Sequence, residues 1–371
     1  MSLRRTRAVL RKEFLHIVRD VRSLIMALAV PLVLLLLFGY ALSLDVDRVP
    51  TLIYDADRTA ASRELIQRFA GSRYFAIQGY VDNYRAIERA IDDNRILLGV
   101  AIPNDYAENL EGGRPAEVQL LLDGSDSNTA SIALAYADSV VHTHALELRG
   151  LGRKLEAPIE ARLRVWYNPA LESKNYIVPG LIAVILAIIA ALLTSLTIAR
   201  EWEMGTMEQV LSTPLRPTEL VLGKMLAYAV VGVVDTATAV AVGVLIFDVP
   251  FRGSLPLLAL SACVFICGAL FWGIFISAMA RSQLLAFQAG LLSTFLPAFL
   301  LSGFVYAIEN MPPVVQLITR IFPTRYFITM LKGIFLKGVG LEVLWVELGF
   351  LLVYGAIVYF AATQKLRQKV A

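Results

Sequence analysis

Six long apolar runs constrain the fold of this chain more than any other feature of its sequence. Each is long enough for the roughly 20 residues that an α-helix needs to cross the hydrocarbon core of a bilayer. The runs are Ser23–Leu44, Asn175–Ala199, Lys224–Phe247, Leu255–Ala280, Leu284–Phe304 and Leu341–Ala362. Hydrophobic residues make up 57% of the 371 positions, more than ordinary soluble domains contain. The sequence predicts a polytopic α-helical membrane protein with about six transmembrane helices.

Both ends of the chain are basic, which predicts the side of the membrane on which they lie. Met1–Arg22 contains seven arginines and lysines against two acids, and Lys365, Arg367 and Lys369 follow the last run. Because cytoplasmic segments carry an excess of Lys and Arg, both termini are expected in the cytoplasm. Apolar residues recur at helical spacing in Met1–Arg22, so this segment is expected to form an amphipathic helix on the membrane surface. A cleaved signal peptide is the competing interpretation, but Ser23–Leu44 is too long an apolar run for one.

The polar segment 45–174 then lies outside the cytoplasm, between the first and second runs. Strand-like and helix-like patterns alternate in it, which predicts an α/β extracytoplasmic domain inserted after the first transmembrane helix. The expected strands are Thr51–Tyr54, Tyr74–Tyr80, Leu97–Ile102, Val118–Leu122 and Arg164–Tyr167. The expected helices are Ala60–Ala70, Tyr84–Asp93, Asn104–Leu110 and Asn128–Leu155.

The sequence shows no catalytic, metal-binding or nucleotide-binding motif. Its near match to a P-loop, Gly223-Lys224-Met225, lacks the first glycine and the hydroxyl residue that would cradle phosphates. Isolated acids and histidines fit turns and helix caps better than a metal or catalytic site; they are Asp55, Asp57, Asp123, Asp126, His142 and His144. A net charge of only +3 gives no support for a nucleic-acid partner. The chain is expected to bind no cofactor or metal and to have no ATP site of its own.

The polar link Arg200–Tyr228 is more elaborate than a turn between two spans requires. It reads REWEMGTMEQVLSTPLRPTELVLGKMLAY and predicts an amphipathic helix within 200–217, ended by prolines. One stripe of that helix would hold Met204, Met207, Val210 and Leu211, flanked by Glu201 and Glu208. A helix lying on lipid head groups would prefer Lys and Arg on its polar face. Its acids therefore favour a protein partner.

Two features of the apolar half of the chain allow more than one interpretation. Residues 307–340 are too polar for a clean span and are expected to form interfacial or re-entrant helices, broken at prolines. Asp235 lies within an apolar run, where an acid at mid-membrane costs about 2.5–3.5 kcal/mol. It either lies on a translocation path or pairs with Thr236, Thr238 or a neighbouring span.

Four passages resemble the ABC-2-type permeases, the membrane subunits of ATP-binding-cassette exporters, and in particular the subfamily with a large extracytoplasmic domain between the first two transmembrane helices. They are the Arg200–Tyr228 link quoted above, LLDGSDSNTASIALAYADSVV (Leu121–Val141), VWYNPALESKNYIVPGLIAVIL (Val165–Leu186) and FPTRYFITMLKGIFLKG (Phe322–Gly338). They are spread over essentially the whole chain.

The resemblance implies a division of labour with a separate ATPase subunit, which would bind ATP and Mg. Residues 200–217 would be the coupling helix that docks into that ATPase; the residues concerned would be Glu201, Glu203, Met204, Met207, Glu208, Val210, Leu211 and Leu215. Residues 1–22 would be a connecting helix that also touches it, through Arg11, Phe14 and Val18. A second permease copy or a paralogue would complete the path, and a periplasmic adaptor is a further expected partner. The location implied is the bacterial inner membrane.

The aliphatic and aromatic residues of the spans are compatible with a hydrophobic or amphipathic substrate, drug-like or lipid-like, without choosing among these. The alternative from another class is a membrane receptor or sensor whose ectodomain binds a ligand. A receptor would be expected to carry a cytoplasmic output domain, for which the sequence shows no candidate segment.

Overall fold

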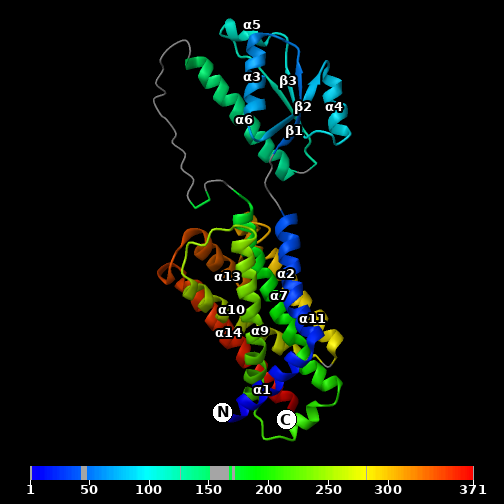
Figure 1. The fold of residues 1–371 in the computed structure, drawn as a ribbon, viewed down its shortest axis with the longest axis vertical. Helices are drawn as coiled ribbons and strands as arrows, with labels where there is room; N and C mark the ends of the chain where they lie inside the picture. Colours follow the sequence, from blue (N-terminus) through cyan, green and yellow to red (C-terminus); the bar gives the residue numbers. More distant parts are fainter. Residues whose placement is uncertain are drawn as a thin grey trace. The chain divides into compact units, whose positions relative to one another are not determined.

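The computed structural model describes residues 2–42, 48–125, 127–150, 167–168, 172–280 and 282–370. They belong to two compact units (Figure 1): a helical unit made of Met1–Ser43 and Val165–Ala371, and an α/β unit made of Leu44–Arg164. Three expectations fall outside the described residues: residues 164–166 of the expected last strand, residues 151–155 of the expected long helix, and Asp126.

The α/β unit is built on a four-stranded sheet of order β2-β1-β3-β4. β1 pairs in parallel with β2 and β3, and β4 runs antiparallel to β3. The strands are β1 (Val49–Asp55), β2 (Phe75–Val81), β3 (Leu98–Ile102) and β4 (Gln119–Leu122). The helices are α3 (Ala60–Gly71), α4 (Tyr84–Asp92), α5 (Tyr106–Glu111) and α6 (Ser127–Gly150). Every residue of β3 is buried, as expected for an interior strand covered on both faces.

The acids that follow β1 shape the turn into α3. Asp55 Oδ1 accepts hydrogen bonds from the backbone N–H groups of Asp57 (3.1 Å) and Arg58 (3.0 Å), and its Oδ2 accepts one from the Ser62 hydroxyl (2.8 Å). Thr59 and Ser62 form a capping box at the start of α3. These contacts agree with the interpretation of Asp55 and Asp57 as turn and cap residues.

The helical unit contains ten α-helices among the described residues. They are α1 (Leu3–Arg19), α2 (Val21–Ala41), α7 (Lys174–Glu203), α8 (Met207–Leu211), α9 (Pro217–Leu245), α10 (Leu255–Met279), α11 (Gln283–Leu300), α12 (Pro313–Thr319), α13 (Pro323–Lys332) and α14 (Leu341–Val370). In this part of the chain α7, α9, α10, α11 and α14 are long and apolar enough to cross a membrane. The apolar part of α2, Ala27–Ala41, is shorter, so a total of six spans stays a prediction.

Helix α7 lies at the centre of the helical unit, against α2, α9, α10, α11 and α13 (Figure 1). It is apolar on all sides over most of its length, which suits a helix surrounded by others. Helix α10 approaches it closely because residue 273 is glycine: a Cβ there would lie 2.4 Å from the Ala191 carbonyl oxygen. At the same crossing the Thr194 hydroxyl donates to the Leu270 carbonyl oxygen at 2.9 Å. Small residues and interhelical hydrogen bonds of this kind are typical of membrane helix packing.

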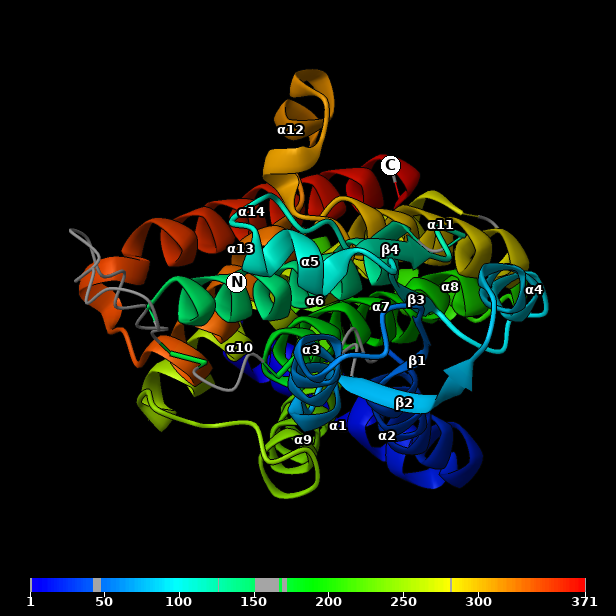
Figure 2. The ribbon, with the colours of Figure 1, turned by 90° about the horizontal axis from the view of Figure 1, so that it is seen from above.

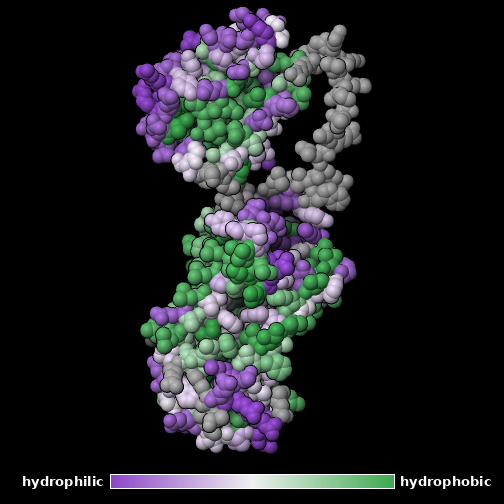
Figure 3. Space-filling model, turned by 180° about the vertical axis from the view of Figure 1, so that it is seen from behind, coloured by the Kyte–Doolittle hydropathy of each residue, from purple (hydrophilic) through white to green (hydrophobic). Residues whose placement is uncertain are grey.

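The outer surface of the helical unit is hydrophobic in its middle and hydrophilic at one end. On the face shown in Figure 3, hydrophobic residues gather over the middle of this unit and hydrophilic residues gather at the end that carries α1. Exposed apolar side chains on the long helices include Val33, Leu37, Leu292, Val346 and Leu352. An apolar belt above a charged end is what a bilayer requires of a multi-pass protein.

Residues 307–340 form short helices, as their prolines predict. Helix α12 projects from the side of the bundle (Figure 2) and exposes Val314 and Leu317, whereas α13 is buried against α10 and α14. Phe327 of α13 stacks on Phe265 of α10 with ring centroids 4.1 Å apart. The interfacial or re-entrant position of residues 307–340 in a membrane stays a prediction.

Candidate functional site

Helix α1 is held against the start of α9 by a close backbone approach. The buried face of α1 is formed by Thr6, Val9, Glu13 and Ile17, which recur at helical spacing. Gly223 of α9 faces it, and a Cβ at this position would lie only 2.6 Å from the Cβ of Val9. Glycine at 223 therefore allows the two helices to touch.

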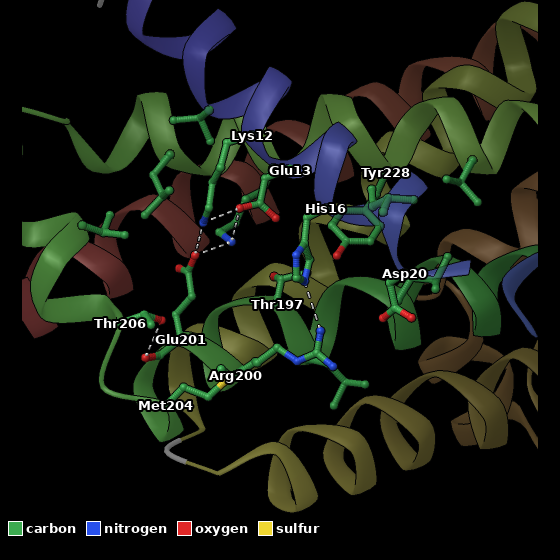
Figure 4. A pocket seen from close by; sticks show the side chains of 18 of the residues that line it. Lys12, Glu13, His16, Asp20, Thr197, Arg200, Glu201, Met204, Thr206 and Tyr228 are labelled. Atoms are coloured by element: carbon green, nitrogen blue, oxygen red, sulfur yellow. Dashed lines mark hydrogen bonds and ion pairs between the residues drawn. The ribbon is translucent and has the colours of Figure 1, made fainter. Parts of the chain in front are cut away.

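Four charged side chains meet beside that face and define what we call the charge cluster: Lys12, Glu13, Glu201 and Lys224 (Figure 4). Lys224 Nζ, on a side chain only 1% exposed, lies 3.0 Å from Glu13 Oε1 and 3.1 Å from Glu201 Oε1. Lys12 Nζ lies 2.9 Å and 2.8 Å from the same two oxygens. The cluster therefore joins α1, the end of α7 and α9 by two cations and two anions.

The charges of the cluster shift the pKa values of its members on α1. Burial opposes the charged form of Glu13, but the ammonium groups of Lys224 and Lys12 outweigh it and hold the pKa of this carboxyl below its ordinary value. Partial burial likewise opposes the charged form of Lys12, yet its contacts with Glu201 and Glu13 raise the pKa of its ammonium group. Both shifts favour the fully charged cluster at neutral pH.

The segment Met204–Arg216, which we call the coupling loop after the role predicted for it, differs from the single helix predicted over 200–217. Helix α7 continues to Glu203, a turn follows with Gly205 in the left-handed region (φ 71°), and α8 spans only Met207–Leu211. Positive φ is open to glycine at little cost, so Gly205 ends the first helix. Pro217 does not stop a helix; it occupies the first turn of α9, where a proline is well tolerated.

The predicted coupling residues fall into a buried group and an exposed group. Glu201 and Met207 are buried, and Val210 and Leu215 are half-buried against the core. Met204, which is 65% exposed, and Glu203 and Glu208 lie on the surface. Leu211 belongs to α8, but its side chain lies outside the described residues. The predicted common stripe of Met204 and Met207 does not form, because the two methionines lie on either side of the turn.

Two further contacts tie the coupling loop and its surroundings to neighbouring helices. Arg5 of α1 donates from Nη1 to the Pro214 carbonyl oxygen at 2.5 Å. Glu203 accepts a hydrogen bond of 2.7 Å from the backbone N–H of Gln283, the first residue of α11. A carboxylate at a helix N-terminus is favoured by the helix dipole.

The predicted connecting-helix residues lie on the other face of α1. Arg11, Phe14 and Val18 are exposed, with Phe14 and Val18 at 40% and 46%. They are separated by three and four residues, so they share one face of the helix, opposite the stripe that packs against α9.

A large cavity lies between α1, α2, α7, α9 and the coupling loop. Its volume is about 1020 Å³. It is lined by charged and polar groups, including His16, Arg200 and the charge cluster (Figure 4), and by aliphatic residues of α1, α2, α7, α9 and the coupling loop. A cavity of this composition can hold a molecule with one polar and one apolar end.

Comparison with known proteins shows where this arrangement belongs. The family described as "ABC-2 family transporter protein" matches residues 21–363. The chain belongs to the ABC-2 transporter family. It is 36% identical over 365 residues to the "Probable multidrug ABC transporter permease YbhS" of Escherichia coli K12, covering 98% of this chain and 96% of that protein. Identity is 35% over 362 residues to the "Probable multidrug ABC transporter permease YbhR" of the same strain, covering 98% of each. The "Inner membrane transport permease YhhJ" is 26% identical over 329 residues, 86% of each.

Family membership and the apolar helices together make this ABC-2 permease a multi-pass membrane protein. Permease subunits of this family lack an ATPase site, in agreement with the missing P-loop. The resemblance to ABC-2-type permeases that the sequence shows is thereby confirmed as membership of that family.

Asp235 of this ABC-2 permease is buried, with 1% of its surface exposed. Its Oδ1 has no hydrogen-bond partner among the described residues. The Thr236 hydroxyl donates instead to the Gly232 carbonyl oxygen, and that of Thr238 donates to the carbonyl oxygens of Val234 and Asp235. The pairing of Asp235 with these threonines is therefore not seen, and Asp235 does not line the cavity described above.

Three members of the charge cluster, Lys12, Glu13 and Lys224, were not predicted from the sequence as site residues. A signal for two of them was present: Lys224 interrupts an apolar stretch, and Glu13 shares a helical face with Val9 and Ile17. Because an isolated charge in either place would be costly to bury, each implies a partner of opposite sign. The sequence alone does not show that they are partners of one another, since 211 residues separate them.

Proposed function

We propose that this chain is the membrane-spanning permease subunit of an ATP-driven ABC exporter. A separate ATPase subunit, which binds ATP and Mg, powers the movement of a hydrophobic or amphipathic substrate out of the cytoplasm or the inner leaflet. The chain lies in a bacterial inner membrane with both termini cytoplasmic, and the α/β unit lies on the outer side. The YbhS and YbhR relatives, each named "Probable multidrug ABC transporter permease", support this proposal.

The observation that carries the proposal is the construction of the coupling loop. Its outer surface presents Met204, Glu208 and Gln209, while Met207 anchors it in the core. Arg5 of α1 contacts the loop at Pro214, and the charge cluster holds the end of α7 that leads into the loop against α1 and α9. A loop that is exposed on one side and tied to long helices on the other can transmit movement of a docked ATPase to those helices.

The docking surface in this proposal includes fewer residues than the sequence predicted, because some of the predicted residues are buried. Glu208 and Met204 of the loop and Arg11, Phe14 and Val18 of α1 are accessible to a partner. Glu201 and Met207 support the loop from inside. A second copy of this chain, or a paralogue related to it as YbhR is to YbhS, completes the translocation path, with an ATPase beneath each subunit. A periplasmic adaptor that receives substrate from the α/β unit is a further proposed partner.

Co-purification from native membranes tests this function. We expect a P-loop ATPase to co-purify with the tagged chain and to hydrolyse ATP in the complex. Met204→Asp puts a charge on the exposed surface of the coupling loop and should weaken the complex about tenfold, as loss of a central interface side chain does. Leu255→Asp is the matched control: Leu255 is 64% exposed, close to the 65% of Met204, but lies at the start of α10. A complex that survives Met204→Asp, or that is equally weakened by Leu255→Asp, would contradict docking at the loop.

A further inference from the structure

We propose that the cavity between α1, α2 and α7 binds an anionic amphiphile, with its head group at Arg200 and His16 and its apolar chain between α2 and α7. The inference rests on the proposed function for its orientation, because it takes Arg200 to lie at the cytoplasmic side of the membrane. It adds a ligand class and a binding place that neither the family nor the relatives' names assign.

The charges that line the cavity favour an anionic head group. The four members of the charge cluster neutralise one another, two cations against two anions. Arg5 lies 3.9 Å from the carboxylate of Glu219. Arg200 contacts His16, with 3.3 Å between Nη1 and Nε2, and no carboxylate of the described residues lies within ion-pair distance of it. Asp20 also lines the cavity and has an interaction of its own; among the described residues no ion pair joins it to Arg200.

Arg200 is well suited to recognise such a head group. Its side chain is exposed at the polar end of the cavity, where Figure 4 shows it directed toward His16. A guanidinium group offers several N–H donors in one plane, which match the oxygens of a phosphate or carboxylate. Since only part of these donors is used by the imidazole, the remainder are available to a ligand.

The other end of the cavity matches an apolar chain. Ile189, Leu192 and Leu196 line it from α7, and Leu24, Ala27 and Val30 line it from α2. Eleven residues separate Ile189 from Arg200, which is about 16 Å along a helix. This is roughly one half of the ~30 Å hydrocarbon core, or the depth of one leaflet. The cavity is thus as deep as the acyl region that a membrane amphiphile occupies.

Its size also fits a molecule of this class. A volume of 1020 Å³ is at the upper end of the roughly 300–1,000 Å³ that ligand sites occupy. Mostly apolar walls with a few polar groups at one end are the usual composition of such sites. A small inorganic anion would leave the apolar end empty.

Binding to the purified full-length chain in a neutral detergent tests the proposal. The probes are two fluorescent single-chain lipids of equal chain length, lysophosphatidylglycerol and lysophosphatidylcholine, measured by polarisation. We expect the anionic probe to bind at least about tenfold more tightly, which is the worth of one charge-assisted contact. Arg200→Gln should remove this preference, and Arg200→Lys should keep most of it.

Two variants serve as controls for position. Arg7→Gln removes an equal charge from the exposed surface of α1, outside the cavity, and should leave the preference unchanged. Leu196→Trp narrows the cavity one turn above Arg200 and should weaken both probes alike. Equal binding of the two probes to the unaltered chain, an equal effect of Arg7→Gln and Arg200→Gln, or full binding by Leu196→Trp would each overturn the proposal.

The ligand could be a resident bilayer lipid or the transported molecule. Native mass spectrometry of the chain purified without probe should show a retained anionic phospholipid in the first case, absent from Arg200→Gln. In the second case the anionic probe should raise ATP turnover of the complex and no lipid is retained. Because binding is measured on the permease alone, a missing ATPase would contradict the proposed function and leave this inference standing.

Discussion

Lys224 shows how a single buried charge organises its surroundings. Its ammonium group has almost no access to water, and taking an ion out of water costs several kcal/mol unless partners replace the lost hydration. Glu13 and Glu201 supply two carboxylates within 3.1 Å. Each carboxylate comes from a different helix, so the need of one lysine for partners brings α1 and α7 to α9.

Lys224→Met should destabilise the protein by about 3–5 kcal/mol, because it leaves the buried Glu13 and Glu201 without their inner cation. Thermal unfolding of the purified chain in detergent measures the effect. Lys12→Met is the matched control, since Lys12 contacts the same two oxygens but is 59% exposed, and it should cost about 1 kcal/mol or less. Equal losses in the two variants would show that burial does not set the strength of these contacts.

The coupling residues show what sequence can and cannot predict at this scale. One helix was predicted over 200–217, whereas the structure has the end of α7, a turn and the short helix α8, so the direction in which each side chain points was not predicted. A regular helix places Met204 and Met207 on one stripe; one glycine with positive φ places the first on the surface and the second in the core. Helical periodicity counted on one side of such a break does not predict where the side chains on the other side point.

At the scale of elements, the contact between α1 and α9 depends on shape rather than charge alone. Gly223 lets Val9 approach the α9 backbone, and one helical turn further along α1 Glu13 reaches Lys224. The amphipathic helix predicted at the N-terminus is present, but its buried face meets protein. Its exposed face combines Arg11 with Phe14 and Val18.

Gly223→Ala should destabilise the α1–α9 contact by about 1–3 kcal/mol, the usual cost of an added methyl group in a tight site. A Cβ at this position would lie 2.6 Å from Val9 Cβ, so α1 must move. Limited trypsin digestion should then cut α1 at Arg4, Arg7 or Arg11 faster than in the unaltered chain. Gly349→Ala is the control, because no atom lies within 4 Å of a Cβ there. Unchanged digestion of Gly223→Ala would mean that α1 is held by its polar contacts alone.

Most elements of the chain were predictable because their periodicity is strong. The expected strand Val118–Leu122 appears as Gln119–Leu122, and the expected helix Ala60–Ala70 as Ala60–Gly71. The boundary between α1 and α2 lies at Asp20 and not between Arg22 and Ser23 as predicted, and α7 extends to Glu203, beyond the predicted end at Ala199. The extension of α7 carries Glu201 to Lys224, a distant partner that local patterns do not contain.

At the scale of the whole molecule, the two units have separate hydrophobic cores. The core of the α/β unit is formed by residues such as Ile53, Leu65, Phe69 and Val100, all of them from its own strands and helices. The helical unit has its own core around α7. Segments of about 100 residues with a hydrophobic core of their own are commonly able to fold alone.

We therefore expect residues 48–150, produced without the helical unit, to be soluble and to unfold cooperatively on heating. Circular dichroism should show helix and strand together, and the near-ultraviolet signal should be lost in one transition. Phe69→Ala should abolish or sharply weaken that transition: Phe69 is fully buried against Phe75, and its truncation costs about 3–5 kcal/mol, a large share of the stability of a domain this size. Tyr80→Ala, at an exposed position of β2, should change the midpoint little. A fragment that aggregates or lacks a cooperative transition would mean that the sheet depends on the membrane helices for its order.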